Sequence, residues 1–381
     1  MTEKLYFTRS GKSHNLSMGI VGLPNVGKST LFNAITRQSV PAENYPFCTI
    51  DPSEGRLLIK DKRLDRLVSI YNPKNVVPAH LLVTDIAGLI KGASEGQGLG
   101  NAFLDHIRRT DGIFQVVRCF EDEDVVHCEN SVCPLRDIKI INDELRFKDI
   151  EFISKKLEKY TKDSKAKGTE KQFQLEYKCL QTISDKLKSS WLSSEDFSND
   201  EIKFINTMNL LTTKNVVYLA NMSEDKFLKK SYGSKMKEMV LEMKKENAIV
   251  IPFSAEYELR MSLDGVYTPF MEKLVENGYK SLNLINFFTA GKDEVKSWTI
   301  RKNSKVTSAG GVIHSDFEDY FVMAEIMSYN DLNVLGSENE VKKAGKYLQR
   351  GKNYVVEDGD IIYFKSNPPK SGDKKAVKAK K

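Results

Sequence analysis

A glycine-rich segment near the start of the chain has the spacing of a phosphate-binding loop. Residues 22–30 read Gly-Leu-Pro-Asn-Val-Gly-Lys-Ser-Thr, which fits the pattern G-x-x-x-x-G-K-[ST]. The glycines allow a tight turn whose backbone N–H groups point into one concavity. Lys28 adds a positive charge for the β- and γ-phosphates, and the Ser29 hydroxyl can ligate Mg²⁺. The segment therefore predicts a site for a nucleoside triphosphate.

The residues on either side of this loop support the prediction. Residues 18–22 are apolar or glycine and read as a buried strand, and residues 31–37 read as a helix. The N-terminus of a helix adds the positive end of its dipole to a phosphate site. An ordinary glycine turn is the alternative, but it does not explain the order of strand, loop and helix.

Two further segments have the positions of switches that sense a γ-phosphate. Asp85-Ile-Ala-Gly88 ends an apolar strand, where Asp85 would hold Mg²⁺ through water and the Gly88 N–H would meet the γ-phosphate. Several glycines follow it, which predicts a loop that can change conformation. Thr49 lies between the first helix and that strand and is predicted to complete the Mg²⁺ shell; a simple strand threonine is the alternative.

The segment Asn221-Met-Ser-Glu224 follows the apolar strand 215–220, where GTPases carry Asn-Lys-x-Asp. That Asp accepts two hydrogen bonds from guanine. Met222 replaces the Lys, and Glu224 is one methylene longer than Asp, so the guanine contact is not obviously available.

Adenine fits these residues better. The amide of Asn221 has a donor and an acceptor that suit adenine N6 and N7. Met222 offers an apolar face to a purine, and the backbone beside it is a second candidate for binding the base edge. Ser254 and Ala255 follow the strand 248–253 and are expected to close the base pocket. The sequence thus favours ATP over GTP.

The chain lacks the usual residue for orienting water. Leu89 occupies the position of the glutamine in Ras-like enzymes, and leucine cannot orient water by hydrogen bonding. Hydrolysis must then be slow or use another group. His127 is one candidate, since histidine can polarise water at neutral pH, and a structural histidine is the alternative. Asn25 is a candidate ligand for a monovalent cation such as K⁺.

Bulk composition limits the class of protein. The chain has 381 residues, of which 40% are hydrophobic and 29% charged, so two or three domains are expected. No apolar run approaches the roughly 18 residues of a membrane span, and no secretory signal is evident. Five cysteines, an odd number, indicate free thiols in a reducing compartment. We expect a cytoplasmic protein that is not attached to a membrane.

The pattern of apolar residues predicts an α/β fold with an insertion. Strand-like and helix-like segments alternate from residue 18 to about 120 and resume at 215–220, which predicts a parallel sheet. Ligands of such sheets bind at the carboxyl ends of the strands. From about 136 to 211, apolar residues three and four apart predict long amphipathic helices. We therefore expect a nucleotide-binding domain over 16–282, interrupted by a helical arm at 136–211.

The C-terminal part of the chain has a different pattern. Residues 283–366 contain three strand-like segments and one helix-like segment, which predicts a small α+β module. Residues 367–381 are rich in lysine and contribute to the net charge of +6. Such a tail is expected to be disordered and to touch nucleic acid nonspecifically, or simply to aid solubility.

With these segments in view, the chain resembles the Obg-like ATPases, also called the YchF family. The resemblance covers nearly the whole chain and rests on the loop, the two switch segments and Asn221–Glu224. Further matching segments are 96–104, 117–122, 287–291, 344–347 and 356–360.

The resemblance implies a Ras-like P-loop NTPase domain with an inserted helical, coiled-coil-like arm and a C-terminal TGS domain of β-grasp type. It implies a preference for ATP, weak hydrolysis and a role near ribosomes in translation or stress control. The resemblance implies that Met222 contacts the base, that Ser29 and Thr49 bind Mg²⁺ and that His127 is a catalytic candidate. Lys28 and Gly88 are the other predicted catalytic residues, through their contacts with the phosphates. The implied phosphate-binding residues are Asn25, Val26, Gly27, Lys28, Ser29 and Thr30.

Three functions remain open. The first is a slow ATPase that acts as a switch on the ribosome, either on the large subunit or on the whole particle, as a monomer with RNA contacts through its basic surface and tail. The second is an Obg-type GTPase in ribosome assembly. The third is a largely noncatalytic scaffold in which bound nucleotide is structural.

Overall fold

The computed structural model describes residues 5–9, 16–37, 53–86, 99–167 and 170–368. The chain divides into two compact units, each built around its own β-sheet. Met1–Leu57 and Leu81–Leu282 form the first unit, and Leu58–His80 and Asn283–Lys381 form the second. Within the described ranges, no helix is both long and apolar enough to cross a bilayer.

The first unit contains a six-stranded sheet in the order β2-β4-β1-β5-β6-β7. Strand β1 runs parallel to both β4 and β5, and the parallel arrangement continues through β6 and β7. The carboxyl ends of these strands therefore meet at one edge, where a site is expected. The strands are β1 Ser17–Val21, β2 Glu54–Leu58, β4 His80–Asp85, β5 Gly112–Arg118, β6 Val216–Asn221 and β7 Ile249–Phe253.

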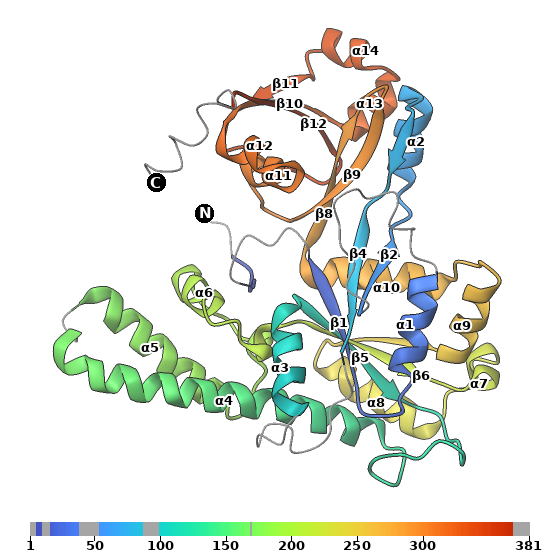
Figure 1. The fold of residues 1–381 in the computed structure, drawn as a ribbon, viewed down its shortest axis with the longest axis vertical. Coiled ribbons are helices and arrows are strands. Elements are labelled where there is room, and N and C mark those ends of the chain that lie inside the picture. Colours follow the sequence, from blue (N-terminus) through green and yellow to red (C-terminus); the bar gives the residue numbers. More distant parts are fainter. Residues whose placement is uncertain (1–4, 10–15, 38–52, 87–98, 168–169, 369–381) are drawn as a thin grey trace. The chain divides into compact units, whose positions relative to one another are not determined.

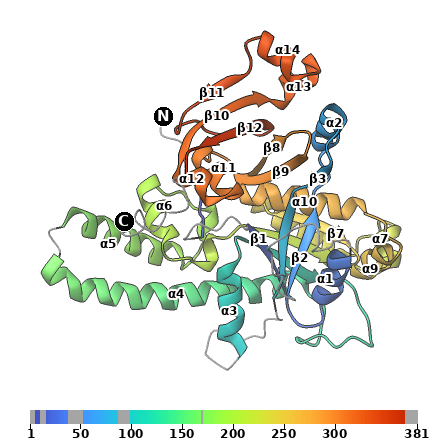
Figure 2. The same cartoon turned by 45° about the horizontal axis from the view of Figure 1, so that its top comes forward.

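Helices cover both faces of this sheet. Val117 and Tyr218 pack against Met236 and Met239 of α8 on one face. On the opposite face Gly278 of α10 lies so close to the sheet that a Cβ there would come within 3.1 Å of the Phe114 ring. Helix α1 lies beside α9 (Figure 2). The helices are α1 Lys28–Arg37, α3 Leu99–Arg109, α7 Glu224–Leu228, α8 Ser234–Lys245, α9 Ala255–Leu263 and α10 Pro269–Leu282.

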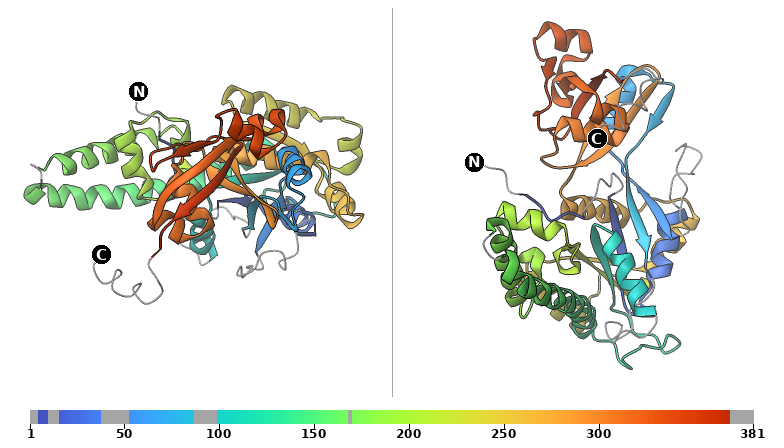
Figure 3. Two further views of the ribbon diagram at one scale, coloured as in Figure 1. Left: turned by 90° about the horizontal axis from the view of Figure 1, so that it is seen from above. Right: turned by 60° about the vertical axis from the view of Figure 1, so that its left-hand side comes forward.

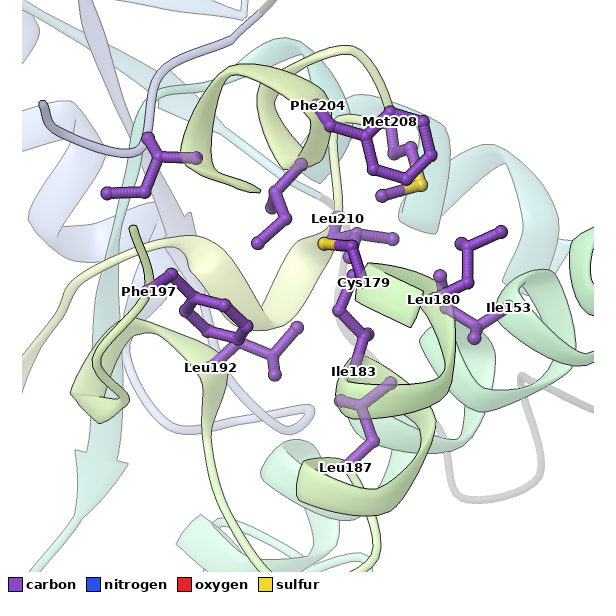
Figure 4. Packing of buried hydrophobic residues seen from close by; sticks show 12 residues of the cluster. Ile153, Cys179, Leu180, Ile183, Leu187, Leu192, Phe197, Phe204, Met208 and Leu210 are labelled. Carbon is purple, nitrogen blue, oxygen red and sulfur yellow. The ribbon is translucent and has the colours of Figure 1, made fainter. Parts of the chain in front are cut away.

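A helical arm lies between β5 and β6 in the sequence, as the apolar pattern predicts. Its long helices α4 and α5 lie side by side (Figure 1), and apolar side chains such as Leu180 and Ile183 form a separate core with Leu192 and Phe197 (Figure 4). Because this core is independent of the sheet, the arm is a built element rather than a long loop. Its elements are α4 Pro134–Lys167, α5 Lys171–Lys186, η3 Leu192–Ser194, α6 Asn199–Asn206 and η4 Leu211–Thr213.

The short segment 5–9 is bound to this arm. The backbone N–H of Leu5 donates to Asn199 Oδ1 and that of Thr8 to Asn206 Oδ1, both over 2.9 Å. The ring of Phe7 meets that of Phe197 edge-on, with centroids 5.9 Å apart. The segment thus extends the hydrophobic core of the arm.

The second unit has a mixed sheet in the order β11-β10-β12-β8-β9-β3. Adjacent Phe287 and Phe288 point to opposite faces and enter different cores, one with Val306 of α11 and one with Leu332 of α13. The strands are β3 Asn75–Val77, β8 Leu284–Ala290, β9 Glu294–Arg301, β10 Phe321–Ser328, β11 Leu348–Arg350 and β12 Asp360–Ser366. The helices are α2 Lys62–Tyr71, α11 Val306–Ile313, α12 Ser315–Asp319, α13 Tyr329–Leu335 and α14 Glu338–Lys343.

This unit is larger than the predicted module 283–366. Residues 58–80 also belong to it: β3 pairs in parallel with β9, and α2 packs on β8 and β9 (Figure 3). Leu67 of α2 is buried in the same core as Phe288. The chain does divide between residues 282 and 283, where the prediction placed the boundary. The assignment of 58–80 to the nucleotide-binding domain needs correction, because this segment, far away in the sequence, supplies an edge strand and a covering helix to the second unit.

Candidate functional site

The predicted phosphate loop connects the end of β1 to the start of α1. Asn25 and Gly27 have positive φ values of 60° and 97°, so the loop turns through two left-handed positions. Asparagine tolerates that conformation, and glycine adopts it freely. A Cβ at position 27 would also lie 2.3 Å from Asn221 Nδ2. Two constraints thus require glycine at this point of the loop.

Lys28 is folded back onto the loop. Its Nζ donates to the Leu23 carbonyl over 2.7 Å, and the residue is only 8% exposed. Burial lowers the pKa of Lys28 to about 8, while the nearby Asp85 carboxylate opposes this shift. Ser29 follows in the first turn of α1 and is exposed. The loop therefore places the Lys28 ammonium and the exposed Ser29 hydroxyl at the N-terminus of α1.

Asp85 ends β4 in register with Ile20 of β1. Burial raises the pKa of Asp85, and the ammonium of Lys28 opposes the increase. Its Oδ1 is buried, and no described residue provides it with a hydrogen-bond partner. A buried carboxylate oxygen of this kind fits a hard divalent cation or its bound water, so the predicted role in holding Mg²⁺ is chemically consistent. Gly88 and Thr49 lie outside the described residues.

Asn221 has a different role from the one predicted. Its Nδ2 donates to the Val26 carbonyl and its Oδ1 accepts from the Ala255 N–H, each over 2.9 Å. The side chain is buried. Its amide thus connects the phosphate loop to the start of α9, and the predicted pairing of this amide with adenine needs correction because both groups already have protein partners.

The other predicted base-pocket residues do come together at this edge of the sheet. Met222 is 2% exposed, and its side chain packs in the core with Met236, so it does not present an apolar face to a base as predicted. Its backbone N–H donates to Phe253. Ser254 is buried and caps α9 by accepting from the Tyr257 N–H. The Asn221 carbonyl accepts from the Cys119 N–H, so this backbone group and the Met222 N–H are both engaged within the protein.

The Glu224 carboxylate, in the position of the guanine-reading Asp, is engaged elsewhere. It forms an ion pair with Arg260 of α9. The Arg260 guanidinium lies 5.4 Å from the Tyr257 ring centroid, and Tyr257 contacts Phe227 at 5.6 Å between centroids. These four side chains connect α7 to α9.

The catalytic candidate His127 is held away from solvent. Its Nδ1 accepts from the Glu129 N–H over 3.0 Å, so its proton is on Nε2, which donates to Asp137 Oδ2 over 2.9 Å. His127 is 7% exposed, and Arg136 also binds the Asp137 carboxylate. This arrangement fits the structural alternative, and contact of a ring nitrogen with water at a phosphate would require at least one of these two hydrogen bonds to break.

Two residues position the loop carrying His127: Arg118, which sequence reasoning missed, and Asn25, which was predicted to be a site residue but not in this role. Arg118 is 1% exposed at the end of β5 and donates to the carbonyls of Phe120, Asp122 and Val125. Asn25 of the phosphate loop donates to the Val126 carbonyl over 3.1 Å. An arginine at the end of a buried strand could have signalled this role. Because buried arginine is rarely unpaired, its position predicts hydrogen bonds to the loop that follows.

Two family models match the chain. Residues 17–173 match one named MMR_HSR1 and described as "50S ribosome-binding GTPase". Residues 284–367 match one named YchF-GTPase_C, whose description is "Protein of unknown function (DUF933)".

Similar proteins extend over almost the full length. The chain is 46% identical over 374 residues to Obg-like ATPase 1 of Oryza sativa subsp. japonica and 47% identical over 382 residues to Obg-like ATPase 1 of Homo sapiens, with 95% of each chain covered. A solved structure, that of the Schizosaccharomyces pombe YchF GTPase, superposes with a TM-score of 0.83 at 44% identity. It covers 95% of this chain and 100% of that one. The predicted P-loop domain with a helical arm and a second α+β unit is confirmed.

Proposed function

Because this chain belongs to the Obg-like ATPase (YchF) family, with a P-loop GTPase fold in its nucleotide domain, we propose that it is a nucleotide-dependent switch that binds ATP with Mg²⁺ and hydrolyses it slowly. The observation that carries the proposal is the phosphate loop itself. Its two left-handed residues, the ammonium of Lys28 and the start of α1 meet at the carboxyl edge of a parallel sheet.

In this proposal the Lys28 ammonium leaves the Leu23 carbonyl and contacts the β- and γ-phosphates. Ser29 and Asp85 would hold Mg²⁺, Asp85 through a water molecule, and the bound ion would neutralise charge on the phosphates. Thr49 and Gly88 complete the set from outside the described residues. Asn25 remains a candidate ligand of K⁺, although one of its amide hydrogens is already used by Val126.

The proposed preference for ATP rests on the segment 221–224. It lacks the Lys and Asp with which GTPases read guanine, and the relatives that match over 95% of the chain are named ATPases. Two names point the other way, since the matching family model and the solved structure are called GTPases. A GTPase of the Obg type is therefore the alternative.

Equilibrium titration with ATP and GTP, each with Mg²⁺, separates these two functions. We expect tighter binding of ATP. A Glu224→Asp variant, which restores the guanine-reading residue type without placing a charge in the core around Met222, should shift the ratio towards GTP, with Lys28→Ala as the control that loses both nucleotides. Tighter binding of GTP by the unchanged protein would overturn the preference for ATP.

The proposed partner is the ribosome, with the protein acting as a cytoplasmic monomer. Support comes from the model description that names the 50S ribosome and from the lysine-rich tail 367–381, suited to RNA phosphates. Single-turnover hydrolysis should accelerate when ribosomes are added. Unchanged hydrolysis, together with ribosome binding that is the same in every nucleotide state, would favour a scaffold instead.

A further inference from the structure

The nucleotide site contains a charged pair that the phosphate chemistry does not use. Glu224 is the first residue of α7, and its carboxylate pairs with the Arg260 guanidinium in the last turn of α9. The two helices follow β6 and β7, whose carboxyl ends frame the expected base pocket. The pair therefore lies where a base would be read, and its charges bear on which base is accepted.

The position of Glu224 relative to the site is fixed by its neighbours. Asn221, three residues earlier, is anchored to both the phosphate loop and the Ala255 N–H. Met222 is anchored by its buried side chain and by its N–H bond to Phe253. These contacts fix the backbone that leads to Ser223. The conformation of the Glu224 side chain therefore decides where its carboxylate lies.

Arg260 is also restrained. Its guanidinium lies over the Tyr257 ring, and Tyr257 packs on Phe227 from the same helix as Glu224. An arginine held over an aromatic ring loses less conformational entropy when it pairs than a free one does. The side chain of Arg260 is half exposed, and that of Glu224 is 24% exposed, so the pair remains accessible to the solvent of the pocket.

We propose that Arg260 is a specificity-determining residue of the nucleotide site, because its pairing with Glu224 withholds from guanine the carboxylate that would otherwise accept from N1–H and the exocyclic amine. This inference rests on the proposed function of the site in ATP binding. Adenine has no donor at N1, so it loses nothing when the carboxylate is engaged.

Removing the guanidinium tests this role. Arg260→Met keeps an apolar stem on Tyr257 but has no charge, which frees the Glu224 carboxylate. The expected result is a two- to fivefold shift of the Kd ratio towards GTP, the size of one exposed ion pair, while the Kd for ATP changes little. Competition of unlabelled ATP and GTP against a fluorescent nucleotide measures both constants under one condition.

Three variants complete the experiment. Arg260→Lys keeps the charge and should retain most of the wild-type ratio. The double variant Arg260→Met, Glu224→Gln should lose the gain for GTP, because the carboxylate is gone. Lys229→Gln, which removes a surface ion pair with Asp225 of α7, is the matched control and should leave the ratio unchanged.

The outcomes separate this inference from the proposed function. If the unchanged protein prefers GTP, the proposed function fails, yet a further shift towards GTP in Arg260→Met would still support the role of Arg260. An unchanged ratio, an equal loss of both affinities, or a gain for GTP that persists in the double variant would each overturn the inference.

Discussion

Lys28 shows how burial tunes a phosphate-binding residue. Its ammonium is almost fully buried against the Leu23 carbonyl, and burial lowers its pKa to about 8. Phosphate oxygens would favour the charged form and raise this pKa again. Binding of a triphosphate is then coupled to uptake of a proton when the pH lies near or above 8.

The first prediction follows from this coupling. Nucleotide affinity should be constant below about pH 7.5 and fall by up to tenfold per pH unit above pH 8, because protonating Lys28 becomes part of binding. Calorimetry at about pH 8.5 in buffers of different ionisation enthalpy should reveal the proton taken up. Equal apparent enthalpies in all buffers would contradict the coupling.

The second prediction concerns the histidine held by Asp137. If His127 acts on water, its bonds to Asp137 and to the Glu129 N–H oppose that action. Asp137→Asn is isosteric but uncharged, so it should weaken the pair and increase single-turnover hydrolysis by roughly two- to tenfold, with ATP affinity unchanged.

A matched set of variants tests whether that increase comes from the histidine. His127→Ala should slow hydrolysis, and the double variant should be no faster than His127→Ala alone. If Asp137→Asn slows hydrolysis as much as His127→Ala does, then the pair assists the reaction directly and the opposing role is wrong.

The sequence predicted site residues where their spacing along the chain defines the chemistry. It did not predict which residues their side chains contact. The pattern around Lys28 and Ser29 identified the phosphate loop, because that loop is continuous in sequence. The partners of Asn221 lie at Val26 and Ala255, and Met222 is buried against α8. Such contacts depend on how separate strands are placed, which one sequence does not reveal.

At the scale of elements, α9 and α10 are joined by a buried acid. Glu258 is fully buried, and its Oε2 accepts from the Thr268 hydroxyl at the start of α10. Its Oε1 has no partner among the described residues. Burial raises the pKa of Glu258 from 4.5 to about 7.

The third prediction is a dependence of stability on pH. A raised carboxyl pKa gives stability that is present below pH 4.5 and lost as the pH rises through 7, since the folded state must then hold a buried charge. Glu258→Gln should remove this loss and gain about 1 to 3 kcal/mol relative to wild type between pH 5 and 8. Urea unfolding at both pH values measures the difference.

The control for this prediction is on the same helix. Glu256 is exposed, so Glu256→Gln should leave the pH dependence of unfolding unchanged. A wild-type protein whose stability does not fall between pH 5 and 8 would show that Glu258 is not the group that titrates in this range.

Most elements were predictable because their patterns are local. The apolar run of β5 and the three- and four-residue spacing in α4 and α5 identify a central strand and two arm helices. Helix α2 is also amphipathic, but its sequence pattern does not indicate which of the two sheets its apolar face packs against. Leu64 and Leu67 pack with Phe288, more than two hundred positions further along the chain.

At the scale of the whole molecule, the chain builds its second unit from two separate segments. Strand β3 forms one edge of that sheet, and Arg63 in the first turn of α2 pairs with Asp358 over 2.8 Å. Without 58–80, the apolar side chains around Phe288 lose their cover. A folding unit defined by the C-terminal family match alone, 284–367, is therefore incomplete.

The fourth prediction tests this construction. A fragment of residues 283–368 should bind a hydrophobic dye and unfold without a cooperative transition, because the face that Leu64 and Leu67 cover is exposed to water. Adding a synthetic peptide of residues 58–80 should restore a cooperative transition and protect backbone amides in β8 and β9 from hydrogen exchange, the strands against which α2 and β3 lie.

A peptide with Leu64→Asp and Leu67→Asp is the control and should restore neither property, since a charge in that core costs several kcal/mol. The fragment could instead unfold cooperatively on its own, with a stability that the peptide does not increase. That result would show that residues 283–368 fold independently of residues 58–80. If only the unmodified peptide restores the transition, then residues 58–80, which lie in the sequence between β2 and β4 of the nucleotide unit, are needed for the second unit to fold.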